Sequence, residues 1–279
     1  MFNLKTILTI AVTLFALNAV GQQPPTNVLP KFTVVPVEND ASWAAEWWRA
    51  RHDEKREQAK STEVDVVFIG DSITHAWENE GEEVWQEYYQ NRNALNLGFA
   101  GDRTEHVLWR LENGAVEAMK PALAVLMIGT NNTGHRMDPA AYVAEGIERI
   151  VSDLRKRLPE TRVLVVGIFP RHVSPYNEMR RRNQEVNRLI SALDNGESVH
   201  YLDVGRGFLN EDGTLRKDLM PDLLHPNAAG YRVWAEAMEP TIERLAGALE
   251  REAAQLETGD PLVAIQAAGS GFSTTGLSG

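Results

Sequence analysis

The sequence predicts an α/β fold: a single domain built on a doubly wound, mainly parallel five-stranded sheet with helices on both faces. Five short apolar runs alternate along the chain with amphipathic segments of helical length, which is the pattern of parallel strands joined by crossover helices. The chain has 279 residues, of which 43% are hydrophobic and 24% charged. Such a composition suits one sizeable core rather than a disordered or membrane-embedded protein.

The five predicted strands are rich in Val, Ile and Leu. An uninterrupted apolar run of this kind is typical of a strand that is buried on both faces. The runs begin at Val66, Ala94, Ala122, Arg162 and Val199, and the last three end at Ile128, Ile168 and Asp203.

Five helices are predicted around these strands. They are expected at 42–60, with Ser42 as N-cap, at 104–112, at 139–158, at 177–193 and from 226 or 227 to 250. Pro240 should kink or interrupt the last of them. Trp43, Trp47 and Trp48 in the first helix could line a sugar site, but packing against the sheet is the commoner use of such a stripe.

The two ends of the chain differ from the rest. Residues 1–21 carry Lys5, an apolar run at 7–16 and the small residues Ala19 and Gly21, which is the layout of a secretory signal peptide cleaved after Gly21. The run is too short to span a membrane, so no stable membrane insertion is expected after cleavage, and the mature protein should be secreted or periplasmic. Residues 22–60 form an N-terminal extension and helix, 61–250 the main domain, and 251–279 a tail expected to be disordered.

Composition excludes several functions. The formal net charge of −11 argues against a nucleic-acid partner, because phosphate binding requires clustered Lys and Arg. The absence of cysteine removes disulfides, thiolate zinc sites and a catalytic thiol. The glycine-rich turn at 98–102 lacks both a P-loop and a dinucleotide fingerprint, so no cofactor is predicted. No metal is predicted either, because neither a His-Glu-x-x-His motif nor a third ligand grouped with Asp222 and His225 appears.

Polar residues with catalytic potential stand at the ends of the predicted strands. Ser72 follows the first strand and can offer its hydroxyl as nucleophile and its N–H to an oxyanion. Gly101 and Asn131 follow the second and third strands. Asp222 and His225 precede the last helix with the spacing of a base and the carboxylate that orients it. Two of these features have a simpler interpretation when taken singly: Asp71 or Ser72 as the N-cap of a helix after the turn, and Asp222 as a capping residue beside a packed His225.

Five short sequence motifs, here called blocks, occur in order along the chain and include these residues. The blocks resemble those of the SGNH (GDSL-type) hydrolases, and within that family the catalytic subunits of intracellular platelet-activating-factor acetylhydrolase. The blocks are Gly70-Asp71-Ser72, 96–102, 106–111, 129–132 and Leu224-His225. The resemblance implies a flavodoxin-like SGNH hydrolase domain and a triad of Ser72, His225 and Asp222. It also implies an oxyanion hole made by the N–H groups of Ser72 and Gly101 and the side-chain amide of Asn131.

The resemblance is not complete. Ile73 stands where the family's tetrad has leucine, Ala100 replaces a further glycine, and a charged Arg103-Thr104-Glu105 segment follows. These changes leave the mechanism in place but not the phospholipid substrate. The sequence therefore predicts a secreted serine esterase for short-chain, acetyl esters of carbohydrates. A lipid esterase and a non-catalytic carbohydrate-binding protein are the alternatives. The expected partners are a small-molecule or carbohydrate ester and, in a homodimer, a second copy of the chain.

Overall fold

A computed structural model describes residues 31–258, which form a parallel sheet between two layers of helices. The strands are β1 (Val66–Gly70), β2 (Ala94–Gly98), β3 (Leu123–Met127), β4 (Arg162–Val166) and β5 (Val199–Leu202), in the order β2-β1-β3-β4-β5. All neighbouring pairs are parallel. The predicted five-stranded, doubly wound sheet is thereby confirmed.

The strand register brings the carboxyl ends of β1, β2 and β3 to one edge of the sheet, where a ligand site can form. Gly70, the last residue of β1, is level with Gly98 of β2 and with Met127 of β3. The chain places β2 on one side of β1 and β3 on the other, so the loops that follow these strands diverge from a common edge. Open parallel sheets bind their ligands at such a switch point.

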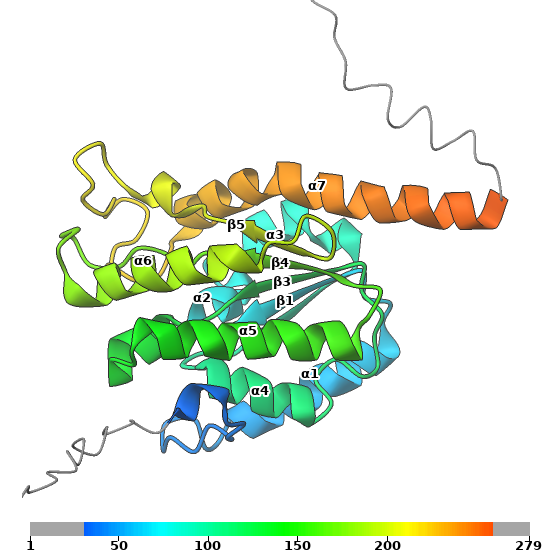
Figure 1. Cartoon of the computed structure of the whole chain (residues 1–279), viewed down its shortest axis with the longest axis horizontal. Coiled ribbons are helices and arrows are strands. Elements are labelled where there is room, and N and C mark those ends of the chain that lie inside the picture. Colours follow the sequence, from blue (N-terminus) through cyan, green and yellow to red (C-terminus); the bar gives the residue numbers. More distant parts are fainter. Residues whose placement is uncertain (1–30, 259–279) are drawn as a thin grey trace, which may run out of the picture. The chain divides into compact units, whose positions relative to one another are not determined.

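Helices cover both faces of the sheet (Figure 1). One core layer contains residues of α1 (Trp48–Ser61), α4 (Thr104–Glu112), α5 (Ala140–Arg157) and α6 (Glu178–Ile190). The other contains residues of α3 (Glu82–Tyr88) and α7 (Ala228–Thr258). The short α2 (Ser72–His75) follows β1 directly. Single turns complete the chain: η1 (Phe32–Val34), η2 (Ala76–Glu78), η3 (Gln90–Arg92), η4 (Asn132–Arg136), η5 (Ser191–Leu193) and η6 (Gly205–Phe208).

The first helix begins later than predicted. Residues 42–47 form turns, and α1 starts at Trp48 with no side-chain N-cap, so the assignment of Ser42 as N-cap is wrong. The physical reason is a distant contact, because the buried Trp48 donates its indole N–H to Asp102 Oδ1 at 2.6 Å. This contact fixes where the regular helix begins. Trp43 lies in the turns before it and is not part of α1.

The last helix is longer than predicted. It runs through Pro240 to Thr258 without interruption, because Met238 and Ile242 on either side are fully buried against the core. Residues 251–258 are therefore helical and not part of a disordered tail. The predicted signal peptide at 1–21 and the remaining tail at 259–279 lie outside the described residues. Within the described part of the chain, no helix is long and apolar enough to cross a membrane.

Candidate active site

Ser72 stands on a tight strand-to-helix turn. The preceding Asp71 caps α2 by accepting the Ile73 N–H at 3.0 Å. A Cβ on Gly70 would lie 2.5 Å from the Met127 carbonyl oxygen, and a Cβ on Gly98 would lie 2.5 Å from the Thr74 carbonyl carbon. Only glycine allows the strand ends and α2 to approach this closely. The two glycines therefore allow the turn that carries Ser72 to pack directly against the ends of the strands.

The loop between β5 and α7 brings a histidine to this serine. Ser72 Oγ lies 2.9 Å from His225 Nε2, although 153 residues separate them in the sequence. His225 Nδ1 lies 2.6 Å from Asp222 Oδ2. The hydroxyl, imidazole and carboxylate therefore form one continuous chain of hydrogen bonds.

Local backbone geometry holds the carboxylate in place. Asp222 Oδ1 accepts the N–H groups of Leu224 and His225 at 2.9 and 2.7 Å, and Leu223 turns the chain with φ +67°. Partial burial opposes ionisation, but the hydrogen bonds from His225 and from the backbone keep the pKa of Asp222 below its usual value. An ionised carboxylate at Nδ1 fixes the tautomer in which Nε2 can take a proton from Ser72.

The Asn131 side chain is hydrogen-bonded to the loop that carries Gly101. Gly101 has φ +76°, a conformation that favours glycine, and the Trp43 ring occupies the place of a side chain, 2.1 Å from where a Cβ would lie. The buried Asn131 Nδ2 donates to the Asp102 carbonyl oxygen at 2.9 Å. A side-chain amide has two N–H groups, so one remains for another acceptor. The two predicted oxyanion donors therefore lie on loops that are bonded to each other.

A buried ion pair anchors the Gly101 loop. Asp102 is fully buried, and its carboxylate accepts hydrogen bonds from Arg110 Nε at 2.9 Å and from the Trp48 indole. Burial raises the pKa of Asp102 to about 6, while Arg110 and Trp48 favour the charged form. Sequence reasoning named no role for Asp102 or Arg110. The aspartate lies in the block at 96–102 and the arginine in the block at 106–111, but only the fold shows that the two side chains are bonded.

Ser72, Asp222 and His225 open into a cleft of about 480 Å³. Its other lining residues are His75, Ala76, Asn79, Glu80, Ala100, Pro221, Pro226 and Asn227. Gly101 and Asn131 are not among them, but Ala100, which directly precedes Gly101, is. Burial lowers the pKa of His75 to about 4, and its Nδ1 accepts the Ala100 N–H at 3.3 Å. His75 is therefore neutral near pH 7 and holds the wall of the cleft.

Asp71 makes the free energy of unfolding of the protein depend on pH. Burial raises the pKa of Asp71 to about 7, and the hydrogen bond from the Ile73 N–H only partly offsets this effect. Between about pH 4 and pH 7 the folded state keeps a proton that the unfolded state loses, so Asp71 makes the protein less stable as the pH rises through this window.

Asp71→Asn keeps an acceptor for the Ile73 N–H but cannot titrate. The free energy of unfolding of the parent relative to this variant should fall by up to about 4 kcal/mol from pH 4 to pH 7, then stay level. Urea unfolding of both proteins at each pH measures the difference, in which the titration of groups that do not interact with Asp71 cancels. A difference independent of pH would mean that Asp71 is ionised throughout.

Among the residues described here, no group of three or more His, Cys, Asp or Glu side chains could hold a metal ion. The geometry offers a hydroxyl, the base that can deprotonate it, a carboxylate that orients the base, and N–H donors on adjoining loops.

The chain is similar to known acyl hydrolases over most of its length. The family model of the GDSL-like Lipase/Acylhydrolase family matches residues 68–233. The platelet-activating factor acetylhydrolase IB subunit alpha1 of Homo sapiens is 40% identical over 199 residues, covering 71% of this chain and 84% of that protein. The alpha2 subunit of Rattus norvegicus is 36% identical over 212 residues, covering 76% and 89%. The solved structure of Axe2, an acetylxylan esterase from Geobacillus stearothermophilus, has a TM-score of 0.53 at 20% identity, covering 67% and 96%, and shares the fold.

Proposed function

Because the chain belongs to the GDSL-like lipase/acylhydrolase family and is an ester hydrolase, we propose that it is an exported serine esterase that removes acetyl groups from carbohydrates. The observation that carries the proposal is the Ser72–His225–Asp222 chain of hydrogen bonds at the cleft. The proposal of export rests on the signal-peptide pattern of residues 1–21. It is tested by determining the N-terminus of the exported protein, which should be Gln22.

In the proposed mechanism, Ser72 Oγ attacks the ester carbonyl carbon while His225 Nε2 takes the hydroxyl proton. The N–H groups of Ser72 and Gly101 and the Asn131 amide stabilise the oxyanion of the tetrahedral intermediate. His225 then gives its proton to the leaving alcohol oxygen. Water attacks the acetyl-enzyme by the same route in reverse, and acetate leaves.

The lining of the cleft supports a short acyl group. Its apolar members are alanine and proline side chains: Ala76, Ala100, Pro221 and Pro226. A long acyl chain gains about 0.8 kcal/mol for each buried methylene, and these small side chains offer little surface for that burial.

Aromatic and polar groups beside the cleft support a sugar as the alcohol portion. Trp43 is 54% exposed and lies against Gly101, and its ring centroid is 6.2 Å from that of Trp47. The Trp47 ring in turn contacts His75 in the cleft wall. An exposed indole can stack on the face of a sugar ring, while Asn79, Glu80 and Asn227 can bind hydroxyl groups. The three tryptophans thus differ: Trp48 packs in the core, whereas the exposed face of Trp43 offers a surface for a sugar ring.

A panel of esters tests the proposal. We expect kcat/KM for p-nitrophenyl esters to be highest for acetyl and to fall with longer chains, and acetylated xylo-oligosaccharides to exceed acetylated lysolipids. Trp43→Ala should raise KM for the acetylated sugars and leave p-nitrophenyl acetate nearly unaffected, because that ester has no sugar ring to stack.

A rise in kcat/KM from acetyl to octanoyl would instead support the second candidate, a lipid esterase. That candidate is favoured by the relatedness to the platelet-activating factor acetylhydrolase subunits. Absence of any hydrolysis, with binding of the sugars retained, would support a non-catalytic carbohydrate-binding protein.

A further inference from the structure

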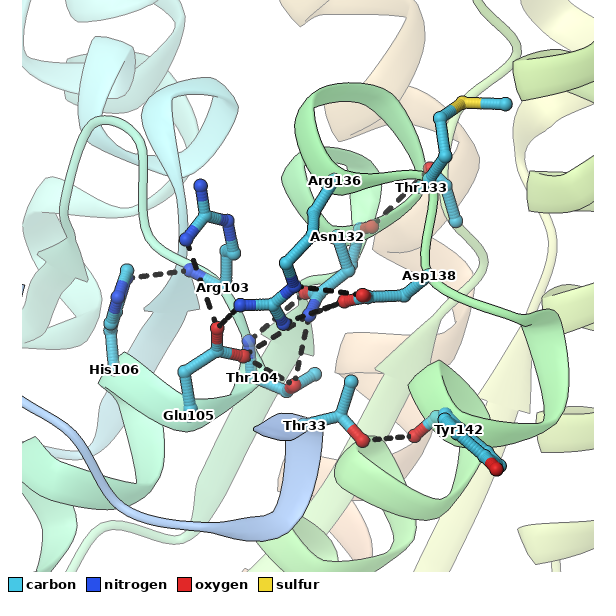
Figure 2. A network of polar contacts seen from close by, with 12 residues as sticks. Thr33, Arg103, Thr104, Glu105, His106, Asn132, Thr133, Arg136, Asp138 and Tyr142 are labelled. Atoms are coloured by element: carbon cyan, nitrogen blue, oxygen red, sulfur yellow. Dashed lines mark hydrogen bonds and ion pairs between the residues drawn. The ribbon is translucent and has the colours of Figure 1, made fainter. Parts of the chain in front are cut away.

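Asn132 joins the two loops that carry the proposed oxyanion donors. It is completely buried, follows Asn131 directly and begins η4. Its Oδ1 accepts the backbone N–H of Thr104, the first residue of α4, at 3.1 Å. Figure 2 shows this side chain between the Thr104–Glu105 turn and the Arg136–Asp138 segment. One buried amide thus ties the loop after β3 to the loop after β2.

Charged neighbours fix the orientation of this amide. Asn132 Nδ2 donates to Glu105 Oε2 at 3.1 Å and to Asp138 Oδ2 at 3.0 Å. Arg136 bridges the same two carboxylates at 2.7 and 2.6 Å, and Arg103 lies 3.8 Å from Glu105. Ionised carboxylates only accept hydrogen bonds, so the NH₂ group must face them and the oxygen must face Thr104. A flipped amide would lose every one of these bonds.

Two of the hydrogen bonds between the oxyanion loops reach the backbone at Asp102 and Thr104. Asn131 Nδ2 binds the Asp102 carbonyl oxygen, and Asn132 Oδ1 binds the Thr104 N–H two residues further along. Two bonds at neighbouring positions define both the separation of the loops and their relative rotation, which one bond cannot do. Donors act on an oxyanion only when they are held at the place where the charge develops.

We infer that Asn132 is a positioning residue, which sets the placement of the Gly101 N–H and the Asn131 amide through its bonds to Thr104, Glu105 and Asp138. The inference rests on the oxyanion roles proposed above. Asn132 makes no contact with the substrate itself. Its contribution should appear in the transition state, where the donors bind most strongly, and not in the binding of the ester.

The test compares Asn132→Ala with a matched control. Asn187 on α6 is also buried, and its side chain makes two hydrogen bonds of similar length, both to the backbone of Ile168. Both alanine variants should lower the melting temperature, because each removes a buried, hydrogen-bonded amide. Only Asn132→Ala should lower kcat, by about 10- to 100-fold with KM nearly unchanged, because a small displacement of catalytic groups has effects of this size. Affinity for a trifluoromethyl ketone, which forms a tetrahedral adduct, should fall by the same factor.

A variant of equal size guards against simple misfolding. Asn132→Asp fills the same volume but, when ionised, faces the carboxylates of Glu105 and Asp138, with only Arg136 and Arg103 to offset three negative charges. Its kcat relative to the parent should be lowest near pH 8 and recover towards pH 5.5, where a protonated carboxyl group can again donate a hydrogen bond. A residue that served only to fill space would show no such recovery.

A double mutant separates positioning from a general loss of structure. In an Asn131→Ala background, Asn132→Ala should reduce kcat less than it does alone, because one of the two donors that it positions is already gone. Equal losses in both backgrounds, or a kcat loss in Asn187→Ala as large as in Asn132→Ala, would overturn the inference. If Ser72→Ala were fully active, the proposed function would fail; if it is inactive while Asn132→Ala is unaffected, only the positioning role fails.

Discussion

Ser72→Ala and His225→Ala are each expected to lower kcat by about 10⁴- to 10⁶-fold, the size seen when one member of a hydrolase triad is removed. Alanine at position 72 has no oxygen to attack the ester, and alanine at 225 leaves the Ser72 hydroxyl without a base. The double variant should be little worse than either single one, since both residues serve the same step. Steady-state hydrolysis of p-nitrophenyl acetate, together with labelling by a fluorophosphonate, measures both effects.

Controls for this prediction are available in the chain. Ser191→Ala and His200→Ala alter a serine and a histidine whose bonds are to nearby backbone carbonyls outside the cleft, and both should keep parental activity. Asp222→Asn should cost up to about 10⁴-fold, because histidine loses the partner that selects its tautomer. Strictly additive losses for Ser72 and His225 would show that the two residues do not share a step.

Asn131→Ala is expected to reduce kcat by about 100- to 1000-fold and to leave KM nearly unchanged, which is the usual effect of removing one oxyanion donor. The amide binds the developing negative charge more strongly than it binds the ground-state carbonyl. Initial rates over a range of acetyl ester concentrations separate the two constants. A rise in KM with constant kcat would mean that Asn131 binds the ester rather than its transition state.

Much of the fold could be predicted from local pattern. The helix at 104–112 has the predicted ends, and the strands start where the apolar runs start or one residue later. Asp222 and His225 could be paired because three residues of spacing already bring them together in a turn. These features depend on contacts between residues that are only a few positions apart in the sequence.

Other features depend on contacts between distant parts of the chain. The start of α1 is set by Trp48 and Asp102, which are 54 residues apart, and a local capping rule at Ser42 cannot anticipate that contact. The bond from Asn132 to Thr104 likewise crosses 28 residues. Asn132 belongs to the block at 129–132, but the positioning role that we infer for it follows only from the adjacency of β1, β2 and β3 in the sheet.

The position of Trp43 and Trp48 bears on where the working unit of this protein begins. The family match starts at residue 68, yet the ring that covers Gly101 and the indole that holds Asp102 come from residues before it. A chain trimmed to the matched segment would retain Ser72, His225 and Asp222 while leaving the adjoining turn uncovered. In recombination between relatives, the segment around 43–48 should therefore be exchanged together with the loop at 98–102, as a single inherited module.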